Sequence, residues 1–386
     1  MNFQLTEEQQ MLKDMIHRYV ERELKPHITE WEGKGESVIE ELTMKYRDMG
    51  MIGIPIPAEY GGQGLTAFEA ILAIEEIAKV SPLAAWPVFE SSLGPVRVIE
   101  LFGNQEQKRT YLPAVCSGKL IISVGMTEPE AGSAVTDLST RAVSEGDDYI
   151  VNGSKRFVTG GGFAGAYLVY VRLSDEKGWK GIGGLLIEKG TPGFSFGKQE
   201  SFMGFDGFPS SDLIFQDCKV PKKNLIVPVG GFKKLMQAFD VERLGNATMS
   251  LGIATGALEA SIEYAKNRKQ FGKPICEFQA VQLMLADMAM KVEAARLLIY
   301  RAAVNASKGY PSVLHSSLGK CFANEIAKEV TDLALQIHGG YGYSKEYPIE
   351  RMVRDSRGWA IAGGTVQIQR INIASELIGR RFNQRA

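Results

Sequence analysis

The chain is poor in the residues that build disulfide frameworks and metal centres. Its 386 residues include only four cysteines and four histidines. The cysteines, at positions 116, 218, 276 and 321, form no C-x-x-C pair. The histidines form no cluster with the spacing of metal ligands. We therefore expect neither a disulfide-stapled fold nor a metal site, and a reducing, cytoplasmic compartment is the simpler interpretation.

Long apolar runs and an excess of charge are also missing. No uninterrupted apolar stretch of about 18 residues occurs, so no transmembrane helix is predicted. The first residues, M-N-F-Q-L-T-E-E, have neither the basic start nor the apolar core of a secretory signal. The formal net charge is −1, which gives no electrostatic reason to expect nucleic acid or a membrane surface as partner.

The residues that are present have ordinary globular proportions, 45% hydrophobic and 23% charged, enough for two or three domains. Near the N-terminus, Thr6 and Gln9 have the spacing of a capping box. An apolar helical stripe follows and ends at Pro26. A glycine-rich turn at Pro57–Gly64 precedes a further helix over residues 67–79.

The middle of the chain changes to strand-like runs. We expect strands at 121–126, 149–151, 157–159, 167–173, 184–187 and 213–215. Asn152-Gly153 lies between two of these runs and predicts a hairpin turn, because both residues tolerate positive φ. From about residue 231 the sequence is helical again, with long apolar stripes typical of a helix bundle.

The predicted fold is therefore α+β with several domains. An N-terminal α-helical domain covers residues 1–120, and a middle antiparallel, β-barrel-like domain covers residues 121–230. A C-terminal four-helix bundle covers residues 231–386.

Five short segments stand out for their chemistry. They are M-T-E-P-E-A-G-S (126–133), G-S-K-R-F-V-T (153–159), R-K-Q-F-G (268–272), Q-I-H-G-G-Y-G (336–342) and R-D-S-R-G-W-A-I-A-G-G-T-V-Q-I-Q-R (354–370). Taken singly, the first is an ordinary turn, the third a solvated helix-end cation and the fourth a helix C-cap. Together and in this order they resemble the acyl-CoA dehydrogenase family of flavoproteins, over nearly the whole chain.

The resemblance implies FAD as cofactor, with contacts from several segments. The expected cofactor-binding residues are Met126, Thr127, Gly132, Ser133, Phe157, Thr159, Arg268, Gln270, Phe271, Gln336, Gly339, Gly340, Thr365 and Gln367. In the family the arginine at position 268 reaches the FAD pyrophosphate of a neighbouring subunit, which suits its forked donors. Glycines at 339 and 340 let backbone N–H groups approach phosphate oxygens. The family norm is a homotetramer, a dimer of dimers.

One expected catalytic residue is missing. In most of the family, position 363 is a glutamate that removes the α-proton of the substrate, but here it is Gly363. Glycine keeps the backbone N–H that stabilises charge on the thioester oxygen and loses the general base. Two other carboxylates are candidates for that base. Glu242, in F-D-V-E-R-L, resembles the base of the isovaleryl-CoA dehydrogenase branch, and Glu90 lies in a segment that forms the acyl pocket wall in the family.

Both carboxylates also have an ordinary structural explanation. Glu242 could belong to a helix-surface ion pair, and Glu90 could be a helix-end or loop carboxylate. A base would instead lie in an apolar pocket, where burial raises its pKa toward neutral pH.

The resemblance also suggests which residues bind the substrate. They are Ser133, Trp86, Phe89, Asp240, Arg243, Gly363 and Gly364. The missing side chain at position 363 suggests a bulky acyl group, branched or cyclic. The segment Ala360–Thr365 is also similar to 3-sulfinopropanoyl-CoA desulfinase, which has lost the base. However, the arginine expected to hold a sulfinate is absent, since no arginine lies between Lys79 and Arg97.

These observations predict FAD-dependent α,β-dehydrogenation of an acyl-CoA, with electrons passed to an electron-transferring flavoprotein. Two alternatives stay open. The same site could act as an enoyl-CoA reductase or a non-oxidative lyase, because the crotonobetainyl-CoA branch also has glycine at this position. The chain could also be an inert acyl-CoA-binding subunit that kept the fold and lost the chemistry.

Overall fold

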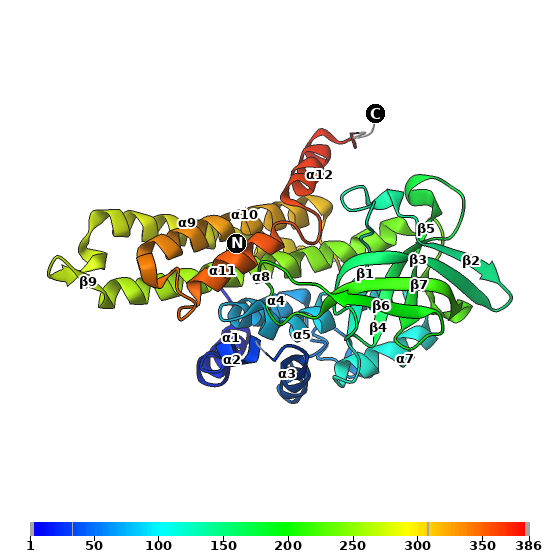
Figure 1. Ribbon diagram of the computed structural model, residues 1–386, viewed down its shortest axis with the longest axis horizontal. Coiled ribbons are helices and arrows are strands. Elements are labelled where there is room, and N and C mark those ends of the chain that lie inside the picture. Colours follow the sequence, from blue (N-terminus) through cyan, green and yellow to red (C-terminus); the bar gives the residue numbers. More distant parts are fainter. Residues whose placement is uncertain (1–3, 33, 307–308, 383–386) are drawn as a thin grey trace.

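The computed structural model describes residues 4–32, 34–306 and 309–382. It has three parts, with the sheet domain at one end, a long helical bundle extending from it, and the N-terminal helices packed beneath (Figure 1). The predicted fold class, helices followed by a sheet domain and then a helical bundle, is confirmed.

The N-terminal part is entirely helical. Its elements are α1 (Glu7–Tyr19) with a π-helical turn Val20–Leu24, α2 (Ile28–Glu32), α3 (Glu36–Asp48), a 3₁₀ turn Ala58–Tyr60, α4 (Ala67–Ala78), α5 (Pro82–Ser92), α6 (Val96–Phe102) and α7 (Gln105–Cys116). The capping box of Thr6 and Gln9 is present in both directions. Nearly every residue of α4 and α5 is buried, because α4 packs on the bundle helix α8 and α5 packs on both α4 and α8.

The middle part is an eight-stranded sheet in the order β6-β7-β3-β2-β4-β5-β8, with β1 paired to β4. Its strands are β1 (Ile122–Gly125), β2 (Arg141–Glu145), β3 (Asp148–Thr159), β4 (Ala166–Arg172), β5 (Ile182–Glu188), β6 (Phe194–Gln199), β7 (Ser210–Pro221) and β8 (Leu225–Val227). The pairing is antiparallel except that β1 and β2 each lie parallel to β4, so the prediction of a purely antiparallel domain needs this correction.

The hairpin predicted at Asn152-Gly153 is wrong. Strand β3 continues straight through both residues, and the turn lies earlier, between β2 and β3. The Asn152 amide exchanges hydrogen bonds with Asp217 on β7, across a shift in register at this point. Gly153 has φ 137°, and a Cβ there would lie 2.7 Å from the Cα of Thr140. The dipeptide therefore serves a bulge and a close backbone contact, which local turn preference cannot distinguish from a hairpin.

The C-terminal part is the predicted bundle. Three long helices, α8 (Phe232–Asn267), α9 (Gln279–Val304) and α10 (Val313–His338), pack with the shorter α11 (Ile349–Trp359), and α12 (Val366–Ile378) crosses α10. A small hairpin of β9 (Lys269–Gln270) and β10 (Lys273–Pro274) forms the far tip (Figure 1). Helix α8 has 36 residues and is about 54 Å long at 1.5 Å per residue. Within the described ranges, no helix is long and apolar enough to cross a membrane.

Candidate active site

The first candidate base, Glu90, is buried inside the protein. It lies on α5, its side chain is 6% exposed, and its Oε1 accepts a hydrogen bond of 2.9 Å from the Trp86 indole N–H one turn earlier. Its other oxygen, Oε2, has no hydrogen-bond partner among the described residues. Burial, together with the charge of Glu242, raises the pKa of Glu90 well above its usual range. Burial therefore favours the protonated, neutral form of Glu90.

The second candidate, Glu242, lies on α8 close enough to Glu90 to influence its protonation. Burial raises the pKa of Glu242 to about 8, although the charge of Arg243 opposes the rise. The charge of Glu242 also adds to the effect of burial on Tyr170 of β4, whose pKa is raised. The fold thus brings together an α5 acid, an α8 acid and a sheet tyrosine, at the place where the sheet domain meets the helices.

The residues flanking Glu242 form a buried ion pair. The guanidinium of Arg243 binds the carboxylate of Asp240 one turn earlier on α8, and the Ser316 hydroxyl donates to the same carboxylate oxygen at 2.9 Å. Arg243 also lies over the ring of Phe239, at 5.1 Å from the ring centroid. The Nε of Arg243 is buried and has no hydrogen-bond partner among the described residues. A donor held in this way is suited to an incoming acceptor group.

Phe89 and Trp86, predicted to line the acyl pocket, are both buried on α5. The Trp86 ring packs against the aromatic rings of Phe163 and Phe208, and the Phe89 ring lies where a Cβ at Gly245 of α8 would come within 2.3 Å. Gly245 therefore allows α5 and α8 to approach closely. Trp86 contributes to the site through its hydrogen bond to Glu90.

Gly363 lies in a turn between α11 and α12, beside helices α8 and α10. Both it and Gly364 have positive φ, 64° and 86°. A Cβ at Gly363 would lie 3.1 Å from the Nδ2 of Asn246 and 3.4 Å from the Cε of Lys320. Within the described chain, no hydrogen bond occupies the N–H of Gly363. The turn thus offers a backbone donor and has little room for a side chain.

The segment with the predicted flavin-binding residues Met126 and Thr127 is fixed by a buried ion pair. The carboxylate of Glu128 binds the Nζ of Lys155 at 2.7 Å, and Lys155 also reaches the carbonyl of Met126 at 3.4 Å. Burial alone would raise the pKa of Glu128, but Lys155 and backbone donors hold it at about 2. The carbonyl of Thr127 accepts a 2.7 Å hydrogen bond from the backbone of strand β3.

Phe157, expected to pack on the flavin, is 53% exposed on β3. It lies at a register shift between β3 and β7 and has φ 56°, an uncommon value for a residue with a side chain. Thr159 follows two residues later and is half-buried. Gly132 and Ser133, farther along the first segment, are exposed. This face of the sheet therefore offers an aromatic ring, a hydroxyl and a glycine-containing loop to a planar ligand.

Six further cofactor-binding predictions lie at the far end of the bundle, namely Arg268, Gln270, Phe271, Gln336, Gly339 and Gly340, whereas Thr365 and Gln367 lie at the start of α12, after the Gly363 turn. Arg268 follows α8 directly and lies over the Tyr341 ring, at 5.3 Å, which places it beside Gly339 and Gly340. Glu242 is about 39 Å away along α8, at 1.5 Å per residue. The structure thus separates one group of predicted cofactor residues, in the sheet domain, from another at the far tip of the bundle (Figure 1).

The residues at the far end of the bundle and those of the C-terminal segment are accessible to a dinucleotide. A Cβ at Gly339 or at Gly340 would meet nothing within 4 Å, so the backbone there is open to an approaching phosphate. Phe271, next to Gln270 in the tip hairpin, is 93% exposed with φ 53°. Gln336 on α10 and Gln367 on α12 are exposed, and Thr365 caps α12.

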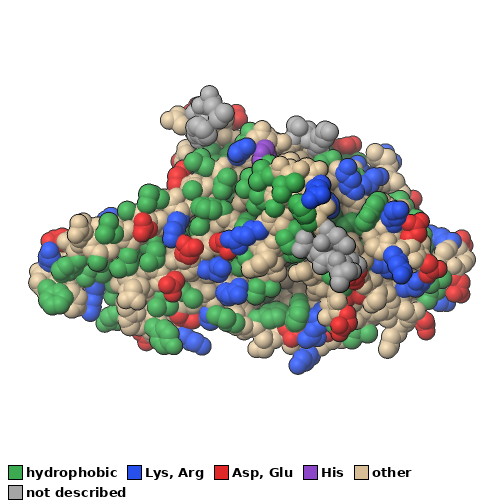
Figure 2. Space-filling view, turned by 90° about the horizontal axis from the view of Figure 1, so that it is seen from above, with side chains coloured by type: hydrophobic (Ala, Val, Ile, Leu, Met, Phe, Trp, Pro, Cys, Tyr) green, Lys and Arg blue, Asp and Glu red, His purple; other side chains and the backbone are tan. Residues whose placement is uncertain are grey.

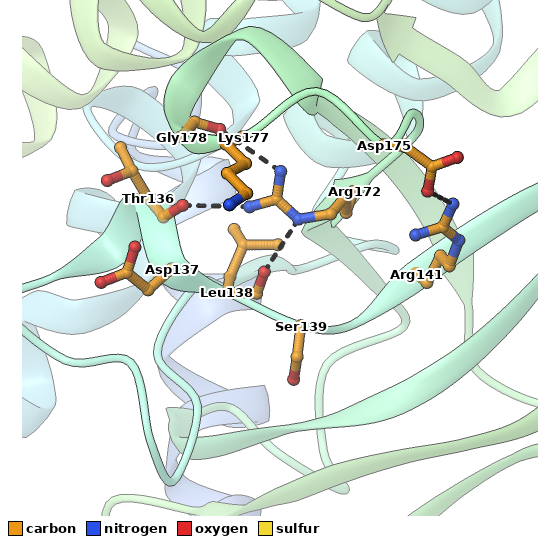
Figure 3. A pocket seen from close by; sticks show the side chains of 9 residues that line it. All are labelled: Thr136, Asp137, Leu138, Ser139, Arg141, Arg172, Asp175, Lys177 and Gly178. Atoms are coloured by element: carbon orange, nitrogen blue, oxygen red, sulfur yellow. Dashed lines mark hydrogen bonds and ion pairs between the residues drawn. The ribbon is translucent and has the colours of Figure 1, made fainter.

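A groove of about 460 Å³ lies beside the loop that follows Ser133 (Figure 3). The guanidinium of Arg172 fills its inner wall and donates to the backbone carbonyls of Thr136, Leu138 and Glu176, at 3.0, 3.2 and 2.7 Å. Arg141 pairs with Asp175 at the rim. Because these cations already have partners within the protein, they hold the loop in place, and we do not include the groove in the active site.

Comparison with known proteins gives one consistent result. The N-terminal, middle and C-terminal domain models of acyl-CoA dehydrogenase match residues 6–119, 123–218 and 230–378. The chain belongs to the acyl-CoA dehydrogenase family. It is 42% identical to the acryloyl-CoA reductase (NADH) of Anaerotignum propionicum over 383 residues, 98% of this chain and 97% of that protein.

Two solved structures of this family are similar over the whole chain. Butyryl-CoA dehydrogenase of Megasphaera elsdenii matches with a TM-score of 0.93 and 39% identity, over 98% of this chain and 100% of that one. A chain in the structure of the electron transferring flavoprotein of Acidaminococcus fermentans, described towards a mechanism of flavin-based electron bifurcation, matches with the same TM-score, 43% identity and the same coverage. This acyl-CoA dehydrogenase is thus an FAD-dependent oxidoreductase acting on acyl-CoA.

Several residues near the site escaped the sequence analysis. Lys320 and Asn324 of α10 are fully buried, and Asn246 of α8 is 4% exposed. Burial and the charge of Arg243 lower the pKa of Lys320 to about 7. The sequence signal that could have found them is a lysine and an asparagine on the buried face of a helix whose other buried residues are mostly small or apolar.

Proposed function

We propose that this acyl-CoA dehydrogenase removes the α-proton of its substrate with Glu242. The supporting observation is the pair of under-partnered acids, Glu90 and Glu242, at the junction of sheet and helices. Near neutral pH a group with a pKa of about 8 exchanges protons readily, as a general base must. Burial and the charge of Glu242 favour the protonated form of Glu90, which receives only the Trp86 hydrogen bond, so we assign the role of base to Glu242.

The other residues assist that proton transfer. The unoccupied N–H of Gly363 donates to the thioester oxygen, which gains negative charge as the α-proton leaves. Arg243 and Asp240, fixed by Ser316, hold the CoA side of the substrate. The charge of an ionised Glu242 further favours the protonated form of Glu90, which limits the negative charge gathered beside the α-carbon.

The bound flavin supplies the hydride acceptor for the β-carbon. The residues that would hold its ring are Met126, Thr127, Phe157 and Thr159, with Thr365 and Gln367 nearby in the C-terminal segment. The pyrophosphate side of a second molecule's cofactor would be held by the residues at the far tip of the bundle, because they lie far from the flavin-ring residues of their own chain. These residues are Arg268, Gln270, Phe271, Gln336, Gly339 and Gly340.

This separation supports a homotetramer built as a dimer of dimers. A second observation agrees with self-association. Helix α9 exposes Leu283, Met290, Leu297 and Val304, which lie seven residues apart along one stripe and are 61, 64, 39 and 69% exposed. Figure 2 shows hydrophobic side chains at the surface along the bundle, between acidic and basic ones. Sedimentation of the purified protein gives the assembly directly, and a monomer that retains FAD would contradict the shared site.

The substrate and the electron acceptor follow from the same features. We infer a branched, cyclic or otherwise bulky acyl group from the absence of a side chain at residue 363, even though Asn246 and Lys320 fill the space that a Cβ there would enter. Electrons then pass to an electron-transferring flavoprotein, as the likeness to a chain in the Acidaminococcus structure suggests. Bleaching by straight-chain butyryl-CoA but by no branched or cyclic thioester would contradict the substrate proposal.

The experiment for the reaction itself is anaerobic flavin spectroscopy. We expect an acyl-CoA to bleach the yellow protein, with a rate that falls strongly in Glu242→Gln and much less in Glu90→Gln. Protein that binds acyl-CoA without bleaching would contradict dehydrogenation and favour a lyase or an inert subunit.

Enoyl-CoA reduction is the second candidate, and the 42% identity to an acryloyl-CoA reductase favours it. With a pKa of about 8, Glu242 is mostly protonated at pH 7 and can return a proton to the α-carbon of an enoyl-CoA. If reduction is the physiological direction, an enoyl-CoA re-oxidises the reduced flavin faster than the acyl-CoA reduces it.

A further inference from the structure

The space beside Gly363 is occupied by a buried amide. Asn246, on α8, is 4% exposed, and its Nδ2 is the atom that a Cβ at residue 363 would approach most closely, at 3.1 Å. The same Nδ2 points to the carbonyl of Ala362 at 3.5 Å. Real Cβ atoms rarely come so near another heavy atom, so a side chain at residue 363 would require Asn246 to move.

Asn246 is not free to move. Its Oδ1 accepts a 3.2 Å hydrogen bond from the Nδ2 of Asn324, and that nitrogen also donates to the Ser250 hydroxyl at 2.8 Å. Asn324 and Ser250 are both fully buried. Turning the Asn246 amide away would leave buried polar groups without partners, which is costly in the interior.

Neighbouring side chains hold the rest of the turn. The Nζ of Lys320 reaches the carbonyl of Trp359 at 3.5 Å, and the Nε2 of Gln369 donates to the carbonyl of Gly364 at 3.0 Å. Thus three carbonyl groups of residues 359–364 face side-chain donors of α8, α10 and α12, while the N–H of Gly363 stays available.

We propose that Asn246, fixed by Asn324 and Ser250, is a positioning residue that keeps position 363 free of a side chain and aims its N–H at the thioester. The second part of this proposal rests on the proposed function. Asn246 thereby commits the enzyme to a base on α8, because a carboxylate restored at residue 363 would meet the locked amide and a left-handed backbone.

The first test is a double-mutant cycle on stability, which does not depend on activity. Gly363→Ala should lower the unfolding midpoint of the FAD-loaded protein, and the drop should be smaller when Asn246→Ala is also present, because the amide contact is gone. Gly364→Ala is the matched control, since a Cβ there would meet Gln369 at 2.9 Å. Its drop should be equal in both backgrounds.

A second control isolates backbone strain. Gly379 has φ 75°, and a Cβ there would meet nothing within 4 Å, so Gly379→Ala reports the cost of the left-handed backbone alone. In the native background, Gly363→Ala should lower the unfolding midpoint more than Gly379→Ala does. In the Asn246→Ala background, the two drops should become similar. An equal Gly363→Ala effect in both backgrounds would overturn the proposal.

The second test uses flavin reduction. In a Glu242→Gln background, Gly363→Glu should restore little of the lost rate of flavin reduction. Adding Asn246→Ala should raise that rate by about 10-fold or more, which is a fraction of what a general base provides. Equal recovery with and without Asn246→Ala would show that the amide does not exclude the side chain. If no acyl-CoA bleaches the unmodified protein, the proposed function fails while the stability cycle still decides the role of Asn246.

Discussion

Two pairs of glutamates, of which Glu242 is half-buried and the other three are buried, lie in opposite surroundings. On α4, Glu75 accepts a 2.9 Å hydrogen bond from Arg296 and one of 2.8 Å from the Tyr300 hydroxyl. Its neighbour Glu76 pairs with Lys79 at 3.0 Å and with Lys13 of α1 at 3.3 Å, and the ring of His17 lies beside it. Burial alone would raise the pKa of Glu75, but Arg296 and the other partners hold it below its usual value.

The pair formed by Glu90 and Glu242 has far fewer partners. Trp86 provides the one side-chain hydrogen bond to it among the described residues, and the pKa of each acid is raised rather than lowered. Glutamates withdrawn from solvent therefore behave in two ways, according to their partners. Glu75 and Glu76 have cationic partners and join helices together. Glu90 and Glu242 have few partners, so their protonated forms are favoured and their protons can be exchanged.

The largest expected effect separates the two pairs by activity. Glu242→Gln removes the proton acceptor and should slow flavin reduction by an acyl-CoA about 10²- to 10⁴-fold, with acyl-CoA affinity retained. Stopped-flow absorbance measures the rate. Glu75→Gln is the matched control and should leave the rate per folded protein unchanged. Equal losses in both variants would mean that the two pairs do not differ in role.

The next effect separates them by stability. Arg296→Met leaves Glu75 buried without its main cation and should lower the free energy of unfolding by about 3–5 kcal/mol. Urea unfolding followed by circular dichroism measures the change. Adding Glu75→Gln to Arg296→Met should recover part of the loss, since no unpaired charge then remains. A loss below about 1 kcal/mol would show that the ion pair of Glu75 and Arg296 contributes little to the stability of the fold.

The pH dependence of the reaction tests the raised pKa of Glu242. A base must be deprotonated, and the deprotonated fraction grows as the pH rises through about 8. We therefore expect kcat/KM for dehydrogenation to rise between about pH 7 and 9 and then level off. A profile that is flat across this window, or that rises near pH 4–5, would place the base elsewhere or in a more polar setting.

The smallest effect concerns stability and pH. The folded pKa of Glu90 is raised, so the folded protein holds a proton that the unfolded chain releases, and stability falls as the pH rises above the unfolded value. Glu90→Gln mimics the protonated acid and should unfold at a higher temperature than the native protein at pH 8, with a gain of at least about 1 kcal/mol. The gain should shrink as the pH falls toward about 4, the pKa of a glutamate in the unfolded chain, and a constant gain would contradict this.

The sequence predicted the parts of this molecule that local pattern decides. The capping box at Thr6 and the order of helical and strand-rich sections follow from short-range spacing, and the structure confirms them. Asn152-Gly153 misled because the pairing of β3 with β7 overrides the local turn preference. A bulge and a hairpin use the same residues, so only the tertiary partner tells them apart.

Some residues of the candidate site could be predicted from the sequence, and others could be found only in the structure. Glu242 and Glu90 were candidates because each belongs to a recognisable segment. The amide lock of Asn246, Ser250 and Asn324 belongs to no motif, since its members meet across helices α8 and α10, and only their burial and distances identify it. Likewise, the sequence could not show that some cofactor residues lie in the sheet domain and others at the far tip of the bundle, because their separation depends on the length and direction of α8.

Proton exchange tests most directly whether Glu242, and not Glu90, accepts the α-proton. Bound acyl-CoA incubated in D₂O with the FAD-loaded enzyme should gain deuterium at its α-carbon, as seen by NMR. We predict that this exchange is lost in Glu242→Gln and persists in Glu90→Gln. Exchange that persists in Glu242→Gln and disappears in Glu90→Gln would contradict the account.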